Sequence, residues 1–95
     1  MQDYPQAVEG LTRSELEGGV AVYQPSADRV HYLNHTGAVI LELCNGEHSV
    51  AEIVHFLQVA FALDTPPEQE VRDLLESMTG LGLVLWADRT PGAPG

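Results

Sequence analysis

The chain has 95 residues, of which 44% are hydrophobic, and its formal net charge at pH 7 is -10, from 14 acidic and four basic side chains. This size allows one domain with one modest core, and so acidic a surface disfavours nucleic acid and anionic lipid, which bind through cationic contacts. No apolar run approaches the roughly 20 residues of a membrane-spanning helix, and the first ten residues lack a signal-peptide pattern. Because the single cysteine, Cys44, cannot form an internal disulfide, we expect a cytoplasmic protein.

We expect one domain over residues 1–95, with an ordered core at about 11–86 and a flexible Pro/Gly-rich tail at 87–95. The first ten residues carry no clear pattern, and Thr12–Glu17 is a weak strand candidate. Residues 19–24 and 29–33 alternate apolar and polar side chains, and the intervening PSAD provides turn-forming residues. These two segments predict a hairpin in which Val30 and Tyr32 share one face and Arg29 and His31 the other.

Two helices are predicted after the hairpin. The first begins at a cap supplied by Asn34 or Thr36 and ends before Asn45–Gly46, a left-handed C-terminal signal. The second opens with Ser49 and Glu52, which have the spacing of a capping box.

A third helix is predicted to begin at a Thr65 cap, with Pro66 in its first turn and Glu68 completing a second capping box. It ends near Gly80, and Leu83–Trp86 is ambiguous. The order of elements predicts an α+β fold of the winged helix-turn-helix type, with a three-stranded antiparallel sheet followed by three helices.

Signals for catalysis, cofactors and metals are absent from the sequence pattern. The four histidines match no compact ligand motif, and Cys44, among apolar neighbours, is expected to be a core thiol rather than a nucleophile. No glycine-rich phosphate loop or serine elbow occurs. We therefore expect a non-enzymatic binding protein with no cofactor and no metal. The histidines are His31, His35, His48 and His55.

Three classes of small binding protein fit the length. An acyl carrier protein needs a serine in an Asp-Ser-Leu setting, whereas Ser49 lies in HSV and strands precede it. A winged-helix nucleic-acid-binding or regulatory protein would read DNA with its third helix, where Arg72 is the only base among four acids. The third class captures a peptide.

Peptide capture follows from the position of the strand RVHYL. A helix follows it directly, so the strand is expected at a sheet edge, where its unpaired backbone can accept an extended peptide. If the third helix packs beside this edge, its apolar side chains form the other wall of a groove next to Val30 and Tyr32. Leu74 is expected in the core, and core and groove roles both stay open for the other apolar positions, namely Val71, Leu75 and Met78.

The segments VHYLNHTGAVILELCNGEHSVAEIVHFL and VRDLLESMTGLGLV resemble the PqqD-like family, the recognition elements of pathways that make modified ribosomal peptides (RiPPs). The resemblance covers roughly Gly19–Val84 as an ordered set of weak motifs. It implies three antiparallel strands, three helices and no catalysis. The sequence departs from the family pattern at its longer N-terminus and at LVLWADRTPGAPG, and either segment could cover the groove or dock on an enzyme.

The resemblance also implies the partners and the binding residues. Members bind the leader segment of a precursor peptide along the third strand, beside the third helix, and present it to a maturation enzyme such as a radical-SAM protein, a leader peptidase or a cyclase. Apart from the resemblance, a bare strand edge can pair with a second copy of the chain when no peptide is bound, so a homodimer is left open as a further partner. The implied peptide-binding residues are Arg29, Val30, His31, Tyr32 and Leu33 on the strand and Val71, Arg72, Leu75 and Met78 on the helix.

Overall fold

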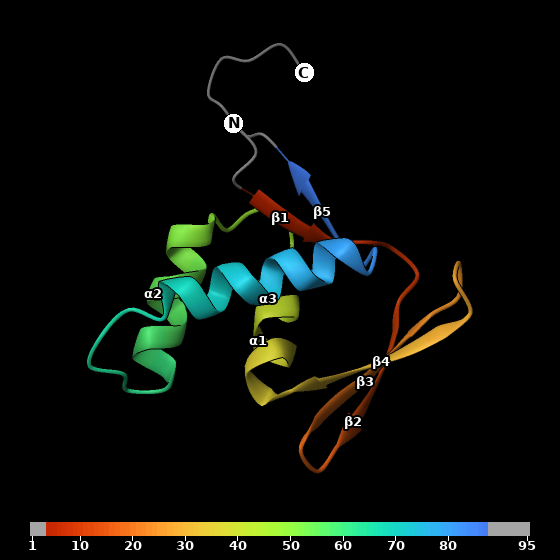
Figure 1. The fold of residues 1–95 in the computed structure, drawn as a ribbon, viewed down its shortest axis with the longest axis horizontal. Helices are drawn as coiled ribbons and strands as arrows, with labels where there is room; N and C mark the ends of the chain where they lie inside the picture. The colour runs from red at the N-terminus through yellow and green to blue at the C-terminus, as the bar shows by residue number, and fades with distance from the viewer. Residues whose placement is uncertain (1–3, 88–95) are drawn as a thin grey trace.

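The structure, a computed structural model, describes residues 4–87 and confirms the predicted order of three antiparallel strands followed by three helices (Figure 1). Beyond Ala87, the tail predicted to be flexible lies outside the described residues. The longest helix has 13 residues, and no helix within residues 4–87 has the length and apolar character of a membrane span. The elements of this main unit are β2 (Thr12–Leu16), β3 (Gly19–Gln24), β4 (Arg29–Asn34), α1 (His35–Leu43), α2 (Val50–Ala60) and α3 (Glu68–Gly80).

A second, two-stranded sheet joins the two ends of the described chain. Strand β1 (Tyr4–Ala7) pairs antiparallel with β5 (Val84–Ala87), and Figure 1 shows them side by side. Pro5 is fully buried, and the Ala7 N–H donates to the Cys44 carbonyl oxygen at 2.7 Å. Strand β1, which starts before the expected ordered core at 11–86, has no signal in the sequence, because four residues that include a proline show no alternation. The ambiguous segment Leu83–Trp86 becomes β5 because β1 provides its partner.

The faces of the main sheet follow the strand register. Val20 and Val22 of β3 are buried, and they pair with Leu33 and His31 of β4. Directly paired residues project to the same face, so Leu33 and His31 point inward. Val30 and Tyr32 therefore lie on the opposite, outer face; the alternation predicted for this strand is correct, and its apolar members face solvent.

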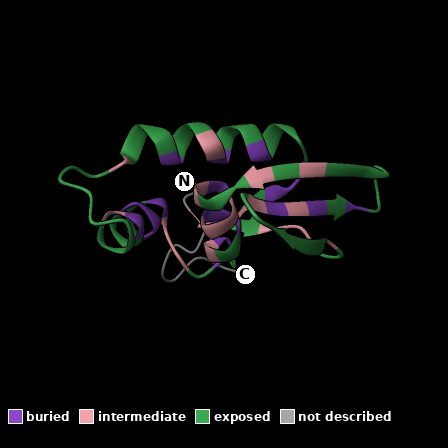
Figure 2. Ribbon diagram, turned by 90° about the horizontal axis from the view of Figure 1, so that it is seen from below, coloured by how far each residue is buried: buried purple, intermediate pink, exposed green. Residues whose placement is uncertain are grey.

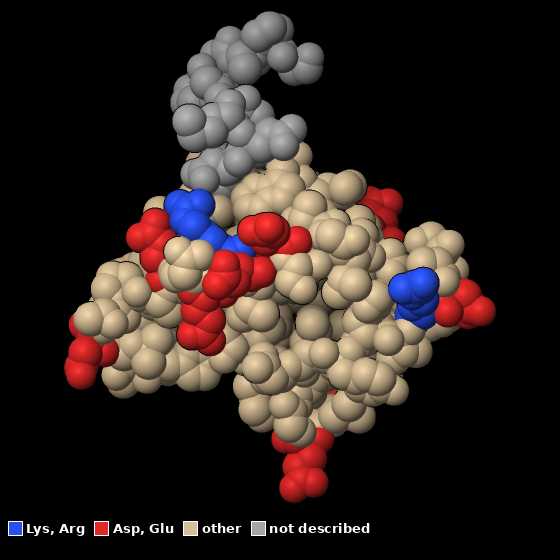
Figure 3. Space-filling model, in the orientation of Figure 1, with Lys and Arg blue, Asp and Glu red and all other residues tan. Residues whose placement is uncertain are grey.

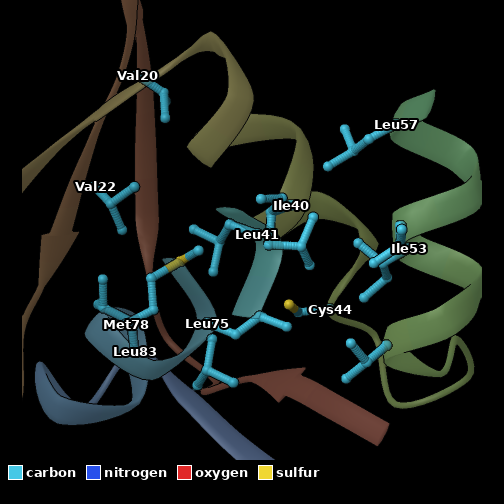
Figure 4. Close-up of a cluster of buried hydrophobic side chains, with 14 residues drawn as sticks. Val20, Val22, Ile40, Leu41, Cys44, Ile53, Leu57, Leu75, Met78 and Leu83 are labelled. Atoms are coloured by element: carbon cyan, nitrogen blue, oxygen red, sulfur yellow. The ribbon is translucent and has the colours of Figure 1, made fainter. Parts of the chain in front are cut away.

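The hydrophobic core lies between the inner sheet face and the three helices, with the buried segments seen as purple in Figure 2 and the side chains in Figure 4. Helices α1, α2 and α3 each contribute their apolar stripe, and Leu83 and Val84 close the core beside β5. The buried apolar residues are Val20, Val22, Ile40, Leu41, Cys44, Val50, Ile53, Val54, Leu57, Val71, Leu75, Met78, Leu83 and Val84.

The starts of the first two helices agree with the sequence. The Asn34 side chain accepts a hydrogen bond from the Gly37 N–H at 2.8 Å, so Asn34 is the cap that ends β4 and starts α1. Ser49 and Glu52 form the predicted capping box at α2, each bonding the other's backbone N–H. The hydrogen bond from the Ser49 backbone lowers the pKa of the Glu52 carboxyl.

The start of α3 differs from the sequence prediction. The helix begins at Glu68 after Pro67, with no side-chain cap, and the predicted capping box between Thr65 and Glu68 is wrong. A residue that precedes proline is disfavoured in the helical region, so Pro66, which precedes Pro67, cannot continue into the first turn. Glu68 instead forms an ion pair with Arg72 at 3.3 Å, one turn along the helix.

Cys44 is buried as the sequence predicted, at the end of α1. Burial disfavours the thiolate and raises the pKa of Cys44 to about 12, although the positive charge of Arg13 acts in the opposite direction. A thiol in this state is a poor nucleophile at neutral pH.

The close approach of β3 to β4 can be tested at Gly19. A Cβ at this position would overlap the Leu33 carbonyl oxygen and lie 2.8 Å from the Asn34 Cα, whereas a Cβ at Gly18 meets nothing within 4 Å. We expect Gly19→Ala to lower the free energy of unfolding by at least about 2 kcal/mol, because two backbones must separate. Urea unfolding measures this, with Gly18→Ala as the matched control; equal stability of the two variants would contradict the described pairing.

The state of Cys44 predicts its reactivity. With a pKa of about 12, roughly one thiol in 10,000 is ionised at pH 8, so alkylation by iodoacetamide should be slow in the folded chain and fast in urea. Labelling at equal rates in the folded and unfolded chain would contradict the buried position.

The raised pKa of Cys44 also means that the folded state holds the thiol proton more tightly than the unfolded state does. The free energy of unfolding should therefore fall as the pH rises from about 9 toward 12.

Candidate functional site

The second edge of β4 is the first feature of the candidate site. Among the described residues, β4 pairs with one strand only, β3, and the sheet order is β2-β3-β4. Alternate residues of an antiparallel strand direct their N–H and C=O groups to opposite sides. Every second residue of β4 therefore directs these groups away from β3, toward the side where α3 runs (Figure 2).

A groove lies between this edge and α3. Its volume is about 350 Å³, and its walls come from the end of β4, the first turn of α1 and the C-terminal half of α3. None of its lining residues carries a charge, in a chain whose net charge is -10. The lining residues are Tyr32, Leu33, Asn34, Gly37, Leu74, Ser77, Met78 and Leu81.

The helical wall of the groove differs from the predicted one. Val71 and Leu75 are 0% and 1% exposed and belong to the core, so neither lines the groove. Leu74, expected in the core, is half-buried and lines the groove with Leu81. The reason is geometric: the stripe that includes 71 and 75 turns toward the core, and the neighbouring stripe, starting at 74, turns toward β4. Met78 is buried and contacts both the core and the groove.

The predicted position of Arg72 is also corrected. Arg72 lies on another side of α3, beside a hollow that it lines together with Glu76 and Trp86, and its guanidinium pairs with Glu68. Arg29 is exposed at the start of β4, outside the residues that line the groove. Neither cation is therefore placed to hold an acidic group inside the groove.

The strand residues divide by their position along β4. Tyr32 is 75% exposed and Leu33 is half-buried, and both line the groove at the end of the strand, whereas Val30, on the same outer face as Tyr32 but nearer the start of the strand, is not among the lining residues. His31 points inward. Because an amide oxygen only accepts, His31 Nε2–H donates to Gln24 Oε1 at 2.8 Å.

The inward hydrogen bond continues to the end of α3. Gln24 is buried, and its Nε2 donates to the Gly82 carbonyl oxygen at 3.3 Å. The chain of contacts therefore links β4 to the turn that follows α3, across the inner side of the sheet. The His31 side chain therefore has a partner on the inner face, and the expected peptide contact of His31 stays a prediction that involves its backbone on β4.

The junction between β4 and α1 closes one end of the groove. Asn34 and Gly37 both line it, and a Cβ on Gly37 would lie 3.3 Å from Asn34 Oδ1 and 3.4 Å from the Leu33 Cβ. Sequence reasoning identified Asn34 as a cap but missed Gly37 as a groove residue. The signal was a glycine in the first turn of a helix, where a larger side chain would crowd the strand end.

The outer face of the main sheet has no charged side chain at its central strand positions. The register places two tyrosines and a valine on this face, with small or hydroxyl-bearing neighbours on β2 and β3. Tyr23 donates its hydroxyl proton to Asp28 of the adjoining turn at 3.0 Å. The face comprises Thr12, Ser14, Leu16, Gly19, Ala21, Tyr23, Val30, Tyr32 and Asn34.

Charges gather elsewhere on the surface. Figure 3 shows red acidic side chains clustered beside a blue basic region on the left of the molecule, over the region where Figure 1 draws α3. The acids of α3 are exposed, as the sequence indicated. The described residues contain no group of three or more His, Cys, Asp or Glu side chains that could hold a metal ion. The acids of α3 are Glu68, Glu70, Asp73 and Glu76.

Comparison with solved structures identifies the fold. The chain is similar to TbiB1 in complex with the TbiA(beta) leader peptide (TM-score 0.72, 20% identity, 87% of this chain and 99% of that one). It is also similar to a lasso peptide synthetase B1 complexed with the leader peptide (0.70, 19%, 86% and 98%). A third match is the PqqD truncation of Methylobacterium extorquens PqqCD, described as a stand-alone RiPP recognition element (0.65, 21%, 85% and 87%). These matches confirm the predicted fold class.

Comparison of sequences identifies the family. A curated protein of Methylococcus capsulatus (strain ATCC 33009 / NCIMB 11132 / Bath), named PqqA binding protein, is 40% identical over 52 residues, which are 55% of each chain. The present chain thus matches about half the length of that relative. The family model described as coenzyme PQQ synthesis protein D (PqqD) matches residues 19–84, so the chain belongs to the PqqD family.

Proposed function

We propose that the chain is a single-domain, non-catalytic module that captures the leader of a ribosomally made precursor peptide as an added strand on β4. The observation that carries the proposal is the unpaired edge of β4 beside an apolar, uncharged groove. The names of the relatives support it, since one is called a PqqA binding protein and two matched structures contain leader peptides.

The geometry assigns separate tasks to the backbone and the side chains. The edge of β4 offers backbone hydrogen bonds, each worth about 0.5–1.5 kcal/mol net, which fix the register of the peptide. A few such bonds do not reach the ~8 kcal/mol of a micromolar complex once a flexible peptide must be ordered. Two or three apolar leader side chains, at about 1.5–3 kcal/mol each when buried, supply the rest. Leu74, Met78 and Leu81 are the side chains they would contact in the groove.

The proposal includes delivery of the bound leader to a maturation enzyme, of the radical-SAM, leader-peptidase or cyclase type, in the cytoplasm. The uncharged outer sheet face supports this step, because the enzyme can approach it without meeting the acidic side chains of α3. Tyr32 belongs to this face and also lines the groove, so a bound leader strand would extend the surface that the enzyme contacts. Pairing of two copies through the β4 edge stays a prediction for the chain without peptide.

Nucleic-acid binding is the alternative that the structure supports least. In a winged-helix reader, α3 would enter the major groove. Its exposed side chains include Glu70, Asp73 and Glu76, and the base Arg72 is already paired with Glu68. Phosphate groups would therefore meet negative charge over residues 68–76 of the helix.

The groove predicts the effect of a charge at Leu74. Leu74→Asp places a carboxylate where apolar leader side chains are buried, so we expect peptide affinity to fall at least 100-fold while the fold is kept, because Leu74 is only half-buried. The probe is a fluorescent peptide selected from a library of random linear peptides on the full chain, and fluorescence anisotropy measures its affinity. Leu85→Asp, at a 62% exposed leucine on β5, is the matched control and should change affinity less than twofold. Equal affinity of both variants, or no selected peptide, contradicts the proposal.

The outer face predicts a variant that separates capture from delivery. Tyr23→Lys adds a charge to this face, beside Asp28, and leaves the groove untouched. In a reaction reconstituted with the precursor and the maturation enzyme encoded beside this chain, we expect normal leader affinity and at least a tenfold loss of the stimulation of modification. Phe56→Lys, at an exposed aromatic residue of α2, should retain full stimulation. Full stimulation by Tyr23→Lys would exclude the outer face as the docking surface.

A further inference from the structure

A second hollow lies at the N-terminal end of α3. Its volume is about 350 Å³, at the low end of the roughly 300–1,000 Å³ typical of ligand cavities, which suits one large side chain better than a separate organic cofactor. Its walls come from the start of α1, the end of α2, the loop after α2 and the first turns of α3. The lining residues are Thr36, Leu57, Phe61, Leu63, Pro67, Glu70 and Val71.

This hollow continues the β4 groove along the same helix. Residues 67, 70, 74, 77 and 81 of the α3 region recur at the spacing of one helical face, and the first two line the hollow while the last three line the groove. The opposite wall is also continuous, because Asn34 and Gly37 line the groove and Thr36, between them, lines the hollow. From residue 74 to residue 70 a helix rises about 6 Å, which is about two residues of an extended peptide.

The rim of the hollow is apolar and is formed by the C-terminal end of α2. Phe61 and Leu63 are 42% and 41% exposed, and both line the hollow. Between them Ala62 has φ = 52°, in the left-handed region, at the position where many helices end. The Leu63 N–H donates to the Gln58 carbonyl oxygen at 2.9 Å, and the Ala62 N–H donates to the Val59 carbonyl oxygen at 3.2 Å, which is the Schellman motif. This helix end therefore fixes the two exposed apolar side chains at the rim.

We propose that this hollow receives one bulky apolar side chain of the peptide bound on β4, from a residue about two positions N-terminal to the segment paired with the strand. The inference rests on the proposed function, and the occupant follows from the continuity of the two sites. All pairings of the sheet are antiparallel, so a fourth strand of the same kind has its N-terminal end at the Asn34 end of β4, where the hollow lies. Glu70 is the only charged lining residue, so an acidic residue at this peptide position is disfavoured.

A double-mutant cycle with a selected peptide tests the inference. We expect Phe61→Ala to weaken binding at least tenfold, and Phe56→Ala, at a 54% exposed phenylalanine of α2, to change it less than twofold. Replacing the apolar residue that precedes the paired segment with alanine should weaken binding to the wild-type chain by a similar factor. The same peptide change should have little further effect on Phe61→Ala, because both changes remove one contact.

The outcomes separate this inference from the proposed function. Additive effects in the cycle, or unchanged affinity of Phe61→Ala, overturn the inference while the loss of binding in Leu74→Asp still supports capture on β4. Unchanged affinity of Leu74→Asp instead overturns the capture site itself. The affinity of the alanine-substituted peptide is also measured with the wild-type chain. If that affinity is unchanged, the inference is wrong, even where Phe61→Ala is poorly folded.

Discussion

The structure depends on one constraint, the way β4 ends. Asn34 pairs with Gly19 at the last position of the strand, and its side chain bonds the Gly37 N–H to start α1. The chain therefore leaves the sheet at once, and the described chain provides no further strand beside β4. Gly19 is required at this position because its backbone lies too close to Leu33 for a side chain. An unpaired strand edge is the direct result.

The second requirement is a helix that serves two surfaces. One stripe of α3, with Val71 and Leu75, completes the core, and the adjacent stripe, with Leu74 and Leu81, faces the edge of β4. An apolar side chain left at a groove is normally unfavourable in water, but here it provides the area that a bound peptide can bury. The two surfaces overlap at Met78, which is buried and lines the groove, and at Leu74, which lines the groove and packs against the core, whereas Leu81 belongs to the groove.

The third feature is the separation of charge. The chain carries a net charge of -10, yet neither the groove nor the central outer face of the sheet has a charged side chain. The negative net charge disfavours unspecific association, and the neutral areas are where a peptide or protein can lose water at low cost. Tyr32 belongs to both areas, so the proposed leader site and the proposed enzyme site meet at one side chain.

The sequence by itself determined the hairpin, the Ser49 cap, the buried Cys44 and the family, because these depend on alternation, local hydrogen bonds and ordered motifs, and it narrowed the first helix cap to Asn34 or Thr36, between which the structure decided. It also led to the strand edge as the candidate site. Only the tertiary structure decided which stripe of α3 faces the groove, since two adjacent apolar stripes are equivalent until the sheet fixes the rotation of the helix. The same holds for β1 and β5, short segments that become strands only because each provides the other's hydrogen bonds.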